Sequence, residues 1–356
     1  MTIDDHDHDH DHDHERGNER GNAADGHTFD HLLAMSDQRG LFEHAKGTEP
    51  RVEHGYCTDD NARLLVVTSR VPDVGAAHQL SRLALHFTRA AQANDGRCRN
   101  RMDAAGRWTD EPGTEDCWGR SIWGFGVAAA QHRNPAVRRW AQQSFDKGVQ
   151  QRSPWPRSMV FAALGAAEVA AIDPQHTPAR ALLNDLLGMI GPLLRDDWVW
   201  PEQQLAYGNA SVAEAVMAAG AALGRPLDVD RGLRMLSWLL ASETRDGHLS
   251  VTGVGGRRAD EHGPQFDQQP IEVAAMADAC WRAHLITGDP SWIGGVETAA
   301  AWFRGHNDAG LMMIDERSHG SYDGLHPHSV NLNQGAESTL ALISTMQRTD
   351  ALVGSR

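Results

Sequence analysis

The sequence predicts an all-α protein, an (α/α)6 barrel in which six inner helices are surrounded by six outer ones. Three observations lead to this prediction: apolar residues recur at helical spacing, strand-like alternation is almost missing, and short turns join the helical segments in pairs. Turn and capping residues divide the chain into twelve helical segments. These helices are expected at residues 29–37, 59–70, 76–93, 118–133, 135–150, 157–171, 177–194, 209–223, 228–243, 269–287, 291–304 and 334–347.

Short connections group the helices into pairs. A short connection places its two helices side by side and antiparallel. The sixth pair joins the last segment to the first, and most of the long loops follow the second helix of a pair. Because these loops differ in length, the alternative architecture, a solenoid with a fixed repeat, is disfavoured. The short connections are Asn134-Pro135, Asp173-Pro174, Gly224-Arg225-Pro226 and Gly288-Asp289-Pro290.

The first helix of each pair should belong to the inner ring and the second to the outer ring. First members are rich in Ala and Gly and nearly uncharged, as in FAALGAAEVAA (161–171), which suits a helix buried on all sides. Second members carry Arg-rich faces, as in AVRRWAQQSF (136–145), which suits contact with water. Several loops contain an Asp-Gly or related turn, and we expect small hairpins over one rim at Asp95-Gly96, Asp246-Gly247 and Asp308-Ala309-Gly310.

Length, charge and cysteine content bound the class of protein. The 356 residues, 40% of them hydrophobic, can build one large core, and we assign a single barrel domain to residues 28–348. Residues 1–27 are expected to be a disordered His/Asp-rich tail and residues 349–356 a C-terminal tail. The net charge of −15 argues against nucleic acid as a partner.

The chain shows no sign of a membrane segment. No apolar stretch reaches the length of about 18 residues that a membrane-spanning helix needs. The four cysteines form no CxxC pair, and the N-terminus lacks an apolar signal segment. We therefore expect no membrane contact, reduced thiols and a cytoplasmic location.

Polar residues gather where the N-termini of the inner helices should converge on one rim. Short Ser, Thr, Asp and Asn side chains at such positions are often only helix caps, each worth about 1 kcal/mol. Capping does not explain the additional carboxylates. Crowded carboxylates repel one another and raise the pKa of at least one of them, and nearby tryptophan rings raise it further, which prepares a general acid. The predicted catalytic residues are Asp59, Asp60, Glu115, Asp116, Asp267 and Glu337.

Aromatic, arginine and amide side chains near this rim are the expected substrate contacts. Eleven tryptophans against three tyrosines are typical of stacking platforms for sugar rings, although Trp123 and Trp155 are equally well interpreted as core residues. Ion pairing with neighbouring acids is the favoured role of Arg63 and Arg120. The predicted substrate-binding residues are Tyr56, Arg63, Trp108, Trp118, Arg120, Trp155, Trp200, Tyr207, Gln268, Gln269, Asn333 and Gln334.

Neither a metal nor a cofactor is expected. The loop histidines, which include His54 and His262, form no HExxH or similar ligand set. The chain has no GxSxG elbow, no Walker loop and no GxGxxG motif after a strand. These observations disfavour zinc enzymes, serine hydrolases, NTPases and dehydrogenases, but not glycosidases, epimerases or lyases.

Four motifs resemble those of a bacterial family of six-hairpin (α/α)6-barrel proteins. The likeness covers residues 28 to 347, and members of that family often occur beside or fused to glycosyltransferases. It implies a barrel fold, a carbohydrate substrate and a glycosyltransferase as a possible partner. The wider superfamily of six-hairpin glycosidases is similar in fold only. The motifs are HGYCTDDNAR (54–63), DEPGTEDCWGR (110–120), FDQQPIE (266–272) and NLNQGAES (331–338).

The favoured function is that of an inverting glycoside hydrolase acting on an oligosaccharide or polysaccharide. Asp60 or Asp116 would be the acid and Glu337 or Asp267 the base, about 6.5–9.5 Å apart. Asp59 and Glu115 would support them.

Two other functions remain open on the sequence. A sugar isomerase or epimerase on the same barrel would use a histidine next to a carbonyl, and His54 and His262 would then matter most. A non-catalytic glycan-binding partner of a glycosyltransferase would need only the tryptophans.

Overall fold

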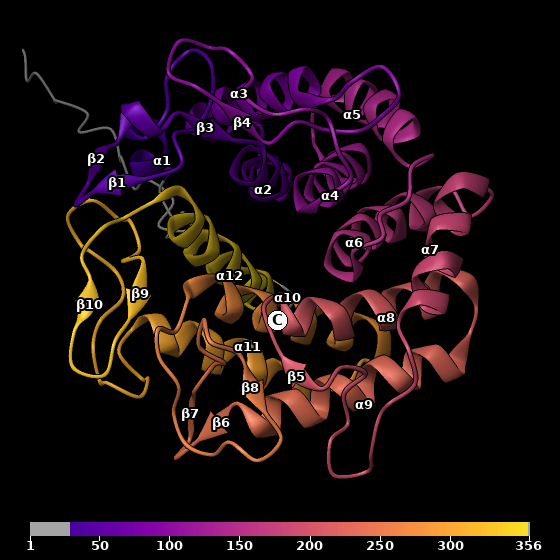
Figure 1. Ribbon diagram of the computed structural model, residues 1–356, viewed down its shortest axis with the longest axis vertical. Helices are drawn as coiled ribbons and strands as arrows, with labels where there is room; N and C mark the ends of the chain where they lie inside the picture. The colour runs from indigo at the N-terminus through magenta and orange to yellow at the C-terminus, as the bar shows by residue number, and fades with distance from the viewer. Residues whose placement is uncertain (1–28, 355–356) are drawn as a thin grey trace, which may run out of the picture.

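The helices form a ring around a central space (Figure 1) in the computed structural model, which describes residues 29–354. Each inner helix packs against the next, and the last packs against the first and closes the ring. The predicted (α/α)6 barrel is therefore confirmed, as a single domain. The inner ring consists of α2 (Thr58–Ser69), α4 (Asp116–Gln131), α6 (Pro156–Ile172), α8 (Asn209–Leu223), α10 (Pro270–Thr287) and α12 (Ala336–Gly354).

The outer ring contains the second helix of each predicted pair. Each packs on the inner helix that precedes it. The short α1 lies beside α12 and α3 and completes the sixth pair, as predicted. The outer helices are α3 (Gly75–Ala91), α5 (Pro135–Gly148), α7 (Thr177–Met189), α9 (Pro226–Ser242), α11 (Ser291–Phe303) and α1 (Asp30–Ala34).

Three helix ends differ from the prediction by three residues or more. Helix α7 ends at Met189 and not at residue 194, because Gly191 and Pro192 follow and do not continue a helix. The opening helix ends at Ala34 and not at residue 37, because Ser36 turns back and pairs with Leu41 in a β-bridge. The last helix continues to Gly354, so helix replaces most of the predicted C-terminal tail. Leu352 is buried, and this contact with the barrel gives the extension a packing reason. The tail predicted at residues 1–27 lies outside the described residues.

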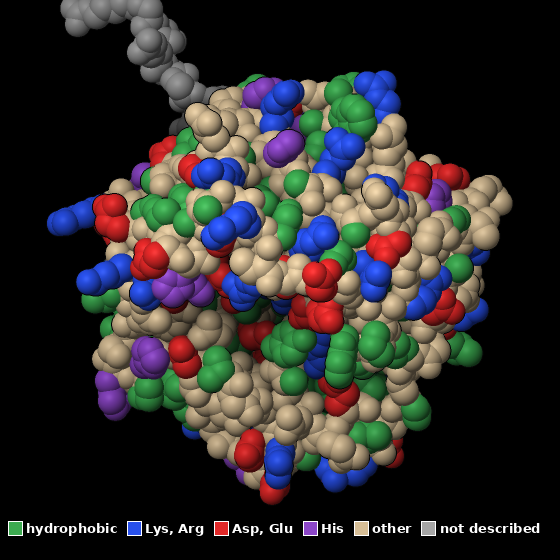
Figure 2. All heavy atoms as spheres, turned by 45° about the horizontal axis from the view of Figure 1, so that its top comes forward, with side chains coloured by type: hydrophobic (Ala, Val, Ile, Leu, Met, Phe, Trp, Pro, Cys, Tyr) green, Lys and Arg blue, Asp and Glu red, His purple; other side chains and the backbone are tan. Residues whose placement is uncertain are grey.

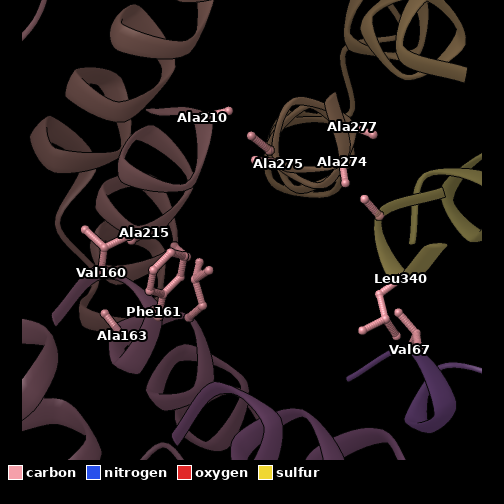
Figure 3. Close-up of a cluster of buried hydrophobic side chains, with 14 of the residues drawn as sticks. Val67, Val160, Phe161, Ala163, Ala210, Ala215, Ala274, Ala275, Ala277 and Leu340 are labelled. Carbon is pink, nitrogen blue, oxygen red and sulfur yellow. The ribbon is translucent and has the colours of Figure 1, made fainter. Parts of the chain in front are cut away.

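Small residues let the inner helices approach closely. Gly126 on α4 and Gly165 on α6 lie against each other, and a Cβ on Gly165 would clash with the carbonyl oxygen of Ile122. Glycine at these positions is required by this close approach of the two backbones. Figure 3 shows apolar side chains from α2, α6, α8, α10 and α12 around the middle of the ring.

The outer helices bury one face, as their periodicity predicts. Helix α5 is typical: Asn134 accepts a hydrogen bond from the backbone N–H of Ala136 and caps it, and Pro135 stands at the first helical position. Phe145 is then buried while Trp140 is largely exposed. The outer ring therefore covers the inner one with apolar faces and meets water with polar ones.

Short antiparallel strands, two residues each, join the loops. Asp246 and Gly247 both adopt positive φ and connect β6 to β7, which confirms the hairpin predicted at this Asp-Gly turn. A 3-10 helix, η1 (Val52–His54), precedes β3. The pairs are β1 (Ala45–Lys46) with β2 (Glu49–Pro50), β3 (Tyr56–Cys57) with β4 (Arg101–Met102), β5 (Gln204–Leu205) with β8 (Arg257–Arg258), β6 (Thr244–Arg245) with β7 (His248–Leu249), and β9 (Gly324–Leu325) with β10 (Val330–Asn331).

The four cysteines are free and buried, in keeping with the expected thiols. Among residues 29–354, no helix combines the length and the apolar character needed to cross a membrane.

Candidate active site

Two connected cavities open at the rim where the inner helices begin. The deep cavity has a volume of about 470 Å³ and the mouth cavity about 390 Å³. The two cavities adjoin at four residues that line both, and together they are called the combined cavity: Arg63, Arg120, Gln269 and Glu337. Figure 2 shows a hollow with acidic side chains inside it and hydrophobic side chains beside it.

Helical periodicity explains how the walls of the cavity are built. On α12, Glu337, Leu340, Ala341 and Ser344 recur at steps of three and four residues and line the deep cavity together. On this helix the charged residue therefore stands at the rim, and small or apolar residues follow below it. In Figure 3 the side chains of Leu340 and Val67, from neighbouring helices, lie close together at this apolar wall.

Arg63 joins two carboxylates at the rim. Its guanidinium donates to Asp60 at 2.7 Å and pairs with Glu337 at 2.7 Å. Burial raises the pKa of Asp60 to about 7, and the negative charge of Glu337 adds to this rise while Arg63 opposes it. The Cys57 thiol donates to the other oxygen of Asp60 at 3.1 Å. Asp60 can therefore gain and lose a proton near neutral pH, whereas the side chain of Glu337 is 44% exposed and ion-paired.

Arg120 holds the other half of the rim. It donates to Asp59 at 2.8 Å, lies 3.5 Å from Asp116, and stacks 4.5 Å above the ring of Phe161. Burial alone would raise the pKa of Asp59, but the positive charges of Arg120 and Arg63 hold it below its ordinary value. Asp59 and Asp60 are neighbours in sequence with opposite shifts, and such a separation is how an active site distinguishes acid from base.

Asp116 lies beside the cavity and is fixed by two hydroxyl groups. Ser158 donates to one oxygen at 2.9 Å and Tyr207 donates to the other at 3.0 Å. Burial and the charge of Asp116 raise the pKa of Tyr207 to about 12, so Tyr207 keeps its proton as a donor. The tyrosine ring lies 5.6 Å from the Arg157 guanidinium, which binds Glu202 through two hydrogen bonds of 2.9 and 2.7 Å.

The structure adds two carboxylates that the sequence analysis did not select. Glu272 and Glu214 both line the deep cavity, and burial raises the pKa of each to about 7. Glu272 accepts hydrogen bonds from the backbone N–H groups of Gly208 and Asn209 at 2.6 and 3.3 Å, where α8 begins. A signal existed for both, since Glu272 ends the FDQQPIE motif and Glu214 is the one charged residue in the apolar run SVAEAVMAAGAAL.

Eight of the predicted site residues line the combined cavity. They come from α2, α4 and α12 and from the loops before α8, α10 and α12, so the N-terminal ends of several inner helices contribute to this cavity. Trp123, for which the sequence left a core position and a substrate contact open, also lines the deep cavity and stacks near Phe161 with ring centroids 6.3 Å apart. The eight residues are Asp59, Asp60, Arg63, Arg120, Tyr207, Gln269, Asn333 and Glu337.

Five predicted substrate contacts lie in the packed interior outside both cavities, which corrects that prediction. Trp118 is fully buried because it stands two residues past Asp116 on another face of α4, and its indole N–H donates to the Gly148 carbonyl at 3.1 Å. The side chains of the other four also donate hydrogen bonds to residues outside the cavities: Trp200 to Glu202, Tyr56 to Asp37, Gln268 to Asp308 and Gln334 to Asp315.

Four further predicted residues lie outside both cavities at or near the surface. Trp108 packs on Phe87, and Trp155 is 58% exposed. Glu115 is exposed before α4 and makes no capping hydrogen bond. Burial raises the pKa of Asp267, but one of its oxygens is buried without a hydrogen-bond partner. We do not assign substrate contact or catalysis to these four.

The histidines considered for isomerase chemistry are not in the combined cavity. His54 lies in η1 near Glu53, and His262 lines a separate cavity of about 250 Å³ beside Trp198 and Trp238. Among the described residues that line the combined cavity, His44 at the mouth is the one histidine.

One group in the described chain has donor atoms spaced closely enough for a metal ion: Glu43, Cys57 and Asp60, within 4.8 Å of one another. Burial and the neighbouring negative charges raise the pKa of the Cys57 thiol well above its ordinary value. A metal would need the thiolate, so the donor set fits a metal poorly.

No protein-family model matches the sequence, and no curated protein matches it. Solved structures match over nearly the whole chain. A sugar epimerase from a ruminal bacterium has a TM-score of 0.68 at 12% identity, with 92% of this chain and 95% of that chain covered. The cellobiose 2-epimerase of Bacillus thermoamylovorans has a TM-score of 0.70 at 10% identity, covering 92% and 96%.

A family 76 glycoside hydrolase from a bovine Bacteroides thetaiotaomicron strain has a TM-score of 0.65 at 8% identity, covering 91% of this chain and 78% of that chain. Likeness at such low identity concerns the fold and not the reaction. The chain shares the six-hairpin (α/α)6-barrel fold of these carbohydrate-processing enzymes.

Proposed function

We propose that the protein is a glycoside hydrolase that cleaves a glycosidic bond with inversion of configuration. The observation that carries this proposal is the Asp60–Arg63–Glu337 group at the mouth cavity. Asp60 is a buried carboxyl with a pKa of about 7, and Glu337 is an accessible carboxylate paired with Arg63. An acid that is protonated near neutral pH and a charged base are the two groups that this reaction requires.

In the proposed step, Asp60 donates its proton to the glycosidic oxygen as the bond from that oxygen to the anomeric carbon breaks. Glu337 takes a proton from a water molecule while the water oxygen bonds to the opposite face of the anomeric carbon. The products are an alcohol and a sugar of inverted configuration, and both carboxyl groups then exchange protons with solvent. The mouth cavity of about 390 Å³ has room for a water molecule beside a sugar ring.

The groups around Arg120 suit charge stabilisation. Asp59 is held ionised next to Arg120, and Asp116 accepts from two hydroxyl groups, so both are negative charges fixed near the mouth. Fixed negative charge stabilises an oxocarbenium-like transition state because the charge is in place before the reaction begins. Asp116 is the alternative base, since it stands on α4 on the other side of α2 from Glu337.

The test uses a panel of gluco- and manno-oligosaccharides with the wild-type protein and three variants. Asp60→Asn and Glu337→Gln should keep the fold and lower turnover by at least about a hundredfold, since general acid–base catalysis contributes that much or more. Asp116→Asn should lower turnover less if Glu337 is the base. If Asp116→Asn lowers turnover more than Glu337→Gln does, the base is Asp116. Full turnover in all three variants would place the reaction elsewhere.

Sugar epimerisation or isomerisation is the second candidate, and the likeness to the sugar epimerase and the cellobiose 2-epimerase favours it. That reaction removes a proton next to a carbonyl carbon, most often with a histidine. Among the residues described, the deep cavity has no histidine in its lining, and the mouth has His44 alone. The carboxylates therefore support hydrolysis better. Incubation of the same sugars in D₂O distinguishes the two, because an epimerase introduces deuterium at the carbon next to the carbonyl and a hydrolase does not.

The third candidate is a non-catalytic glycan-binding protein that acts beside a glycosyltransferase, as the family resemblance implies. This candidate would be supported if the wild-type protein and Asp60→Asn both bind an oligosaccharide and neither of them cleaves it. The perturbed carboxyl groups in the cavity favour catalysis over binding alone.

A further inference from the structure

The far end of the barrel is filled by an ion-pair network, here called the floor network. Arg282 on α10 binds Glu168 on α6 and Glu214 on α8. Asp278, one turn earlier on α10, binds Arg70 at the end of α2 at 3.2 Å and Arg348 on α12.

The network reaches every inner helix. Gln131 at the end of α4 donates to Glu168 at 2.7 Å, and Ser344 on α12 donates to Asp278 at 3.1 Å. The side chains of its charged members are at most 23% exposed. These contacts link all six inner helices, and three of the residues involved, Glu214, Asp278 and Ser344, line the deep cavity.

The depth of the cavity follows from helix geometry. Glu337 at the mouth and Ser344 at the floor are seven residues apart on α12, which corresponds to roughly 10 Å along the helix axis. Between them the wall is apolar, with Leu340 and Ala341 on α12 and Phe161 opposite on α6. A pocket of this depth with polar groups at both ends and aromatic rings in its wall suits a sugar ring, which has apolar faces and polar edges.

Three members of the floor network line the deep cavity: Glu214, Asp278 and Ser344. Ser344 and Asp278 are hydrogen-bonded to each other, whereas Glu214 keeps part of its carboxyl group free. Glu214 is 4% exposed and lines the deep cavity together with Ser211, one helical turn before it. One carboxyl oxygen receives a long hydrogen bond of 3.4 Å from Arg282. The other oxygen accepts none from the described residues and is not sealed from solvent. A buried carboxyl with a free oxygen that lines a pocket is an acceptor for a ligand donor.

We propose that the deep cavity is a blind pocket that binds the end of a carbohydrate chain, with Glu214 accepting hydrogen bonds from hydroxyl groups of the terminal sugar. This proposal rests on the proposed function, because it places the bond to be cleaved at the level of Asp60 and Glu337. It assigns the substrate class as the ends of neutral sugar chains and short oligosaccharides. An interior segment of a polysaccharide does not fit, since the floor network leaves the chain no exit.

The first experiment compares sugars with ends and sugars without ends. Linear oligosaccharides and their cyclic counterparts of the same linkage, both gluco-configured, are titrated into the full-length protein by calorimetry. We expect the linear sugars to bind at least about tenfold more tightly than the cyclic ones. Equal affinity of the cyclic sugars would overturn the blind pocket, and so would the absence of binding by every linear sugar, with manno-oligosaccharides and disaccharides included in the panel.

The second experiment uses Glu214→Gln with Glu168→Gln as its matched control. Both residues bind Arg282, but among the described residues Glu214 alone of the two lines the cavity. Glu214→Gln replaces one acceptor oxygen with an amide NH₂ group, so it should weaken sugar binding roughly tenfold. Glu168→Gln should change affinity less than about twofold, although both variants lower the melting temperature.

Equal losses of affinity in the two variants, or no loss in either, would mean that the floor network is structural only. The readout is binding and not turnover, so it is separate from the proposed function. If only Glu214→Gln loses affinity and the wild type shows no turnover, the proposed hydrolysis is overturned and the proposed pocket is kept. Turnover with unchanged affinity in Glu214→Gln would overturn the pocket and keep hydrolysis.

Discussion

Replacing Asp60 with Asn should change how the stability of the barrel depends on pH. Its pKa is about 7 in the folded protein against an ordinary value of 3.8. Between these two values the folded protein holds a proton that the unfolded chain has released, so the free energy of unfolding falls as pH rises. This contribution is fully present below about pH 4 and is lost as pH passes 7.

The magnitude follows from the linkage relation. The slope is about 1.4 kcal/mol per pH unit while one proton separates the two states, and it falls to half of this at pH 7, so the wild type loses roughly 2 kcal/mol between pH 5 and pH 7 through Asp60. Glu214 and Glu272, whose pKa values are also raised, add to the total slope. Asp60→Asn removes only the contribution of Asp60, and the stability of the variant should rise by roughly 2 kcal/mol relative to the wild type over this interval.

The assay is urea unfolding followed by circular dichroism at pH 5, 6 and 7. Asp59→Asn is the matched control: the pKa of Asp59 is lowered, so Asp59 is ionised in both states above pH 5 and its loss should leave the slope unchanged. Parallel stability curves for Asp60→Asn and the wild type would refute the reasoning, because they would mean that Asp60 is already ionised at pH 5.

Three further predictions concern packing and positioning. Gly165→Ala should lower the free energy of unfolding, measured by urea unfolding, by at least about 2 kcal/mol, because the added Cβ meets the backbone of α4. In the control Gly188→Ala on α7 the added Cβ meets open space, so this variant should be neutral or stabilising. Trp118→Phe should lower the melting temperature but keep kcat/KM, and a large drop in kcat/KM would return Trp118 to the site. Tyr207→Phe should lower kcat about tenfold with little change in melting temperature, since it removes a donor to Asp116, and an unchanged kcat would exclude this contact from catalysis.

The fold was accessible from the sequence because its signals are local. Helical periodicity, proline after a short turn, and runs such as SVAEAVMAAGAAL each depend on residues close together in the chain. The last helix was predicted too short although no stop signal follows residue 347, and burial of Leu352 favours its extension.

Only part of the site could be predicted from the sequence. The direction in which a side chain faces depends on its position around the helix and on partners that are distant in the sequence. Asp60 and Trp118 stand in equally polar motifs, yet Asp60 faces Arg63 and the mouth while Trp118 turns to the Gly148 carbonyl of α5. Glu214 was not predicted because its partner Arg282 lies 68 residues away in the sequence, and no local pattern indicates such a contact.

The central claim, that the rim carboxylates hydrolyse a glycosidic bond, is tested most directly by proton NMR of oligosaccharide cleavage. Wild-type protein is mixed with gluco- and manno-oligosaccharides, and the anomeric signals are followed from the first minutes, before mutarotation equilibrates them. We predict new reducing ends that appear first in the inverted configuration, and none with Glu337→Gln or Asp60→Asn. First products of retained configuration would contradict inversion, and epimerised sugars with every glycosidic bond intact would contradict hydrolysis itself.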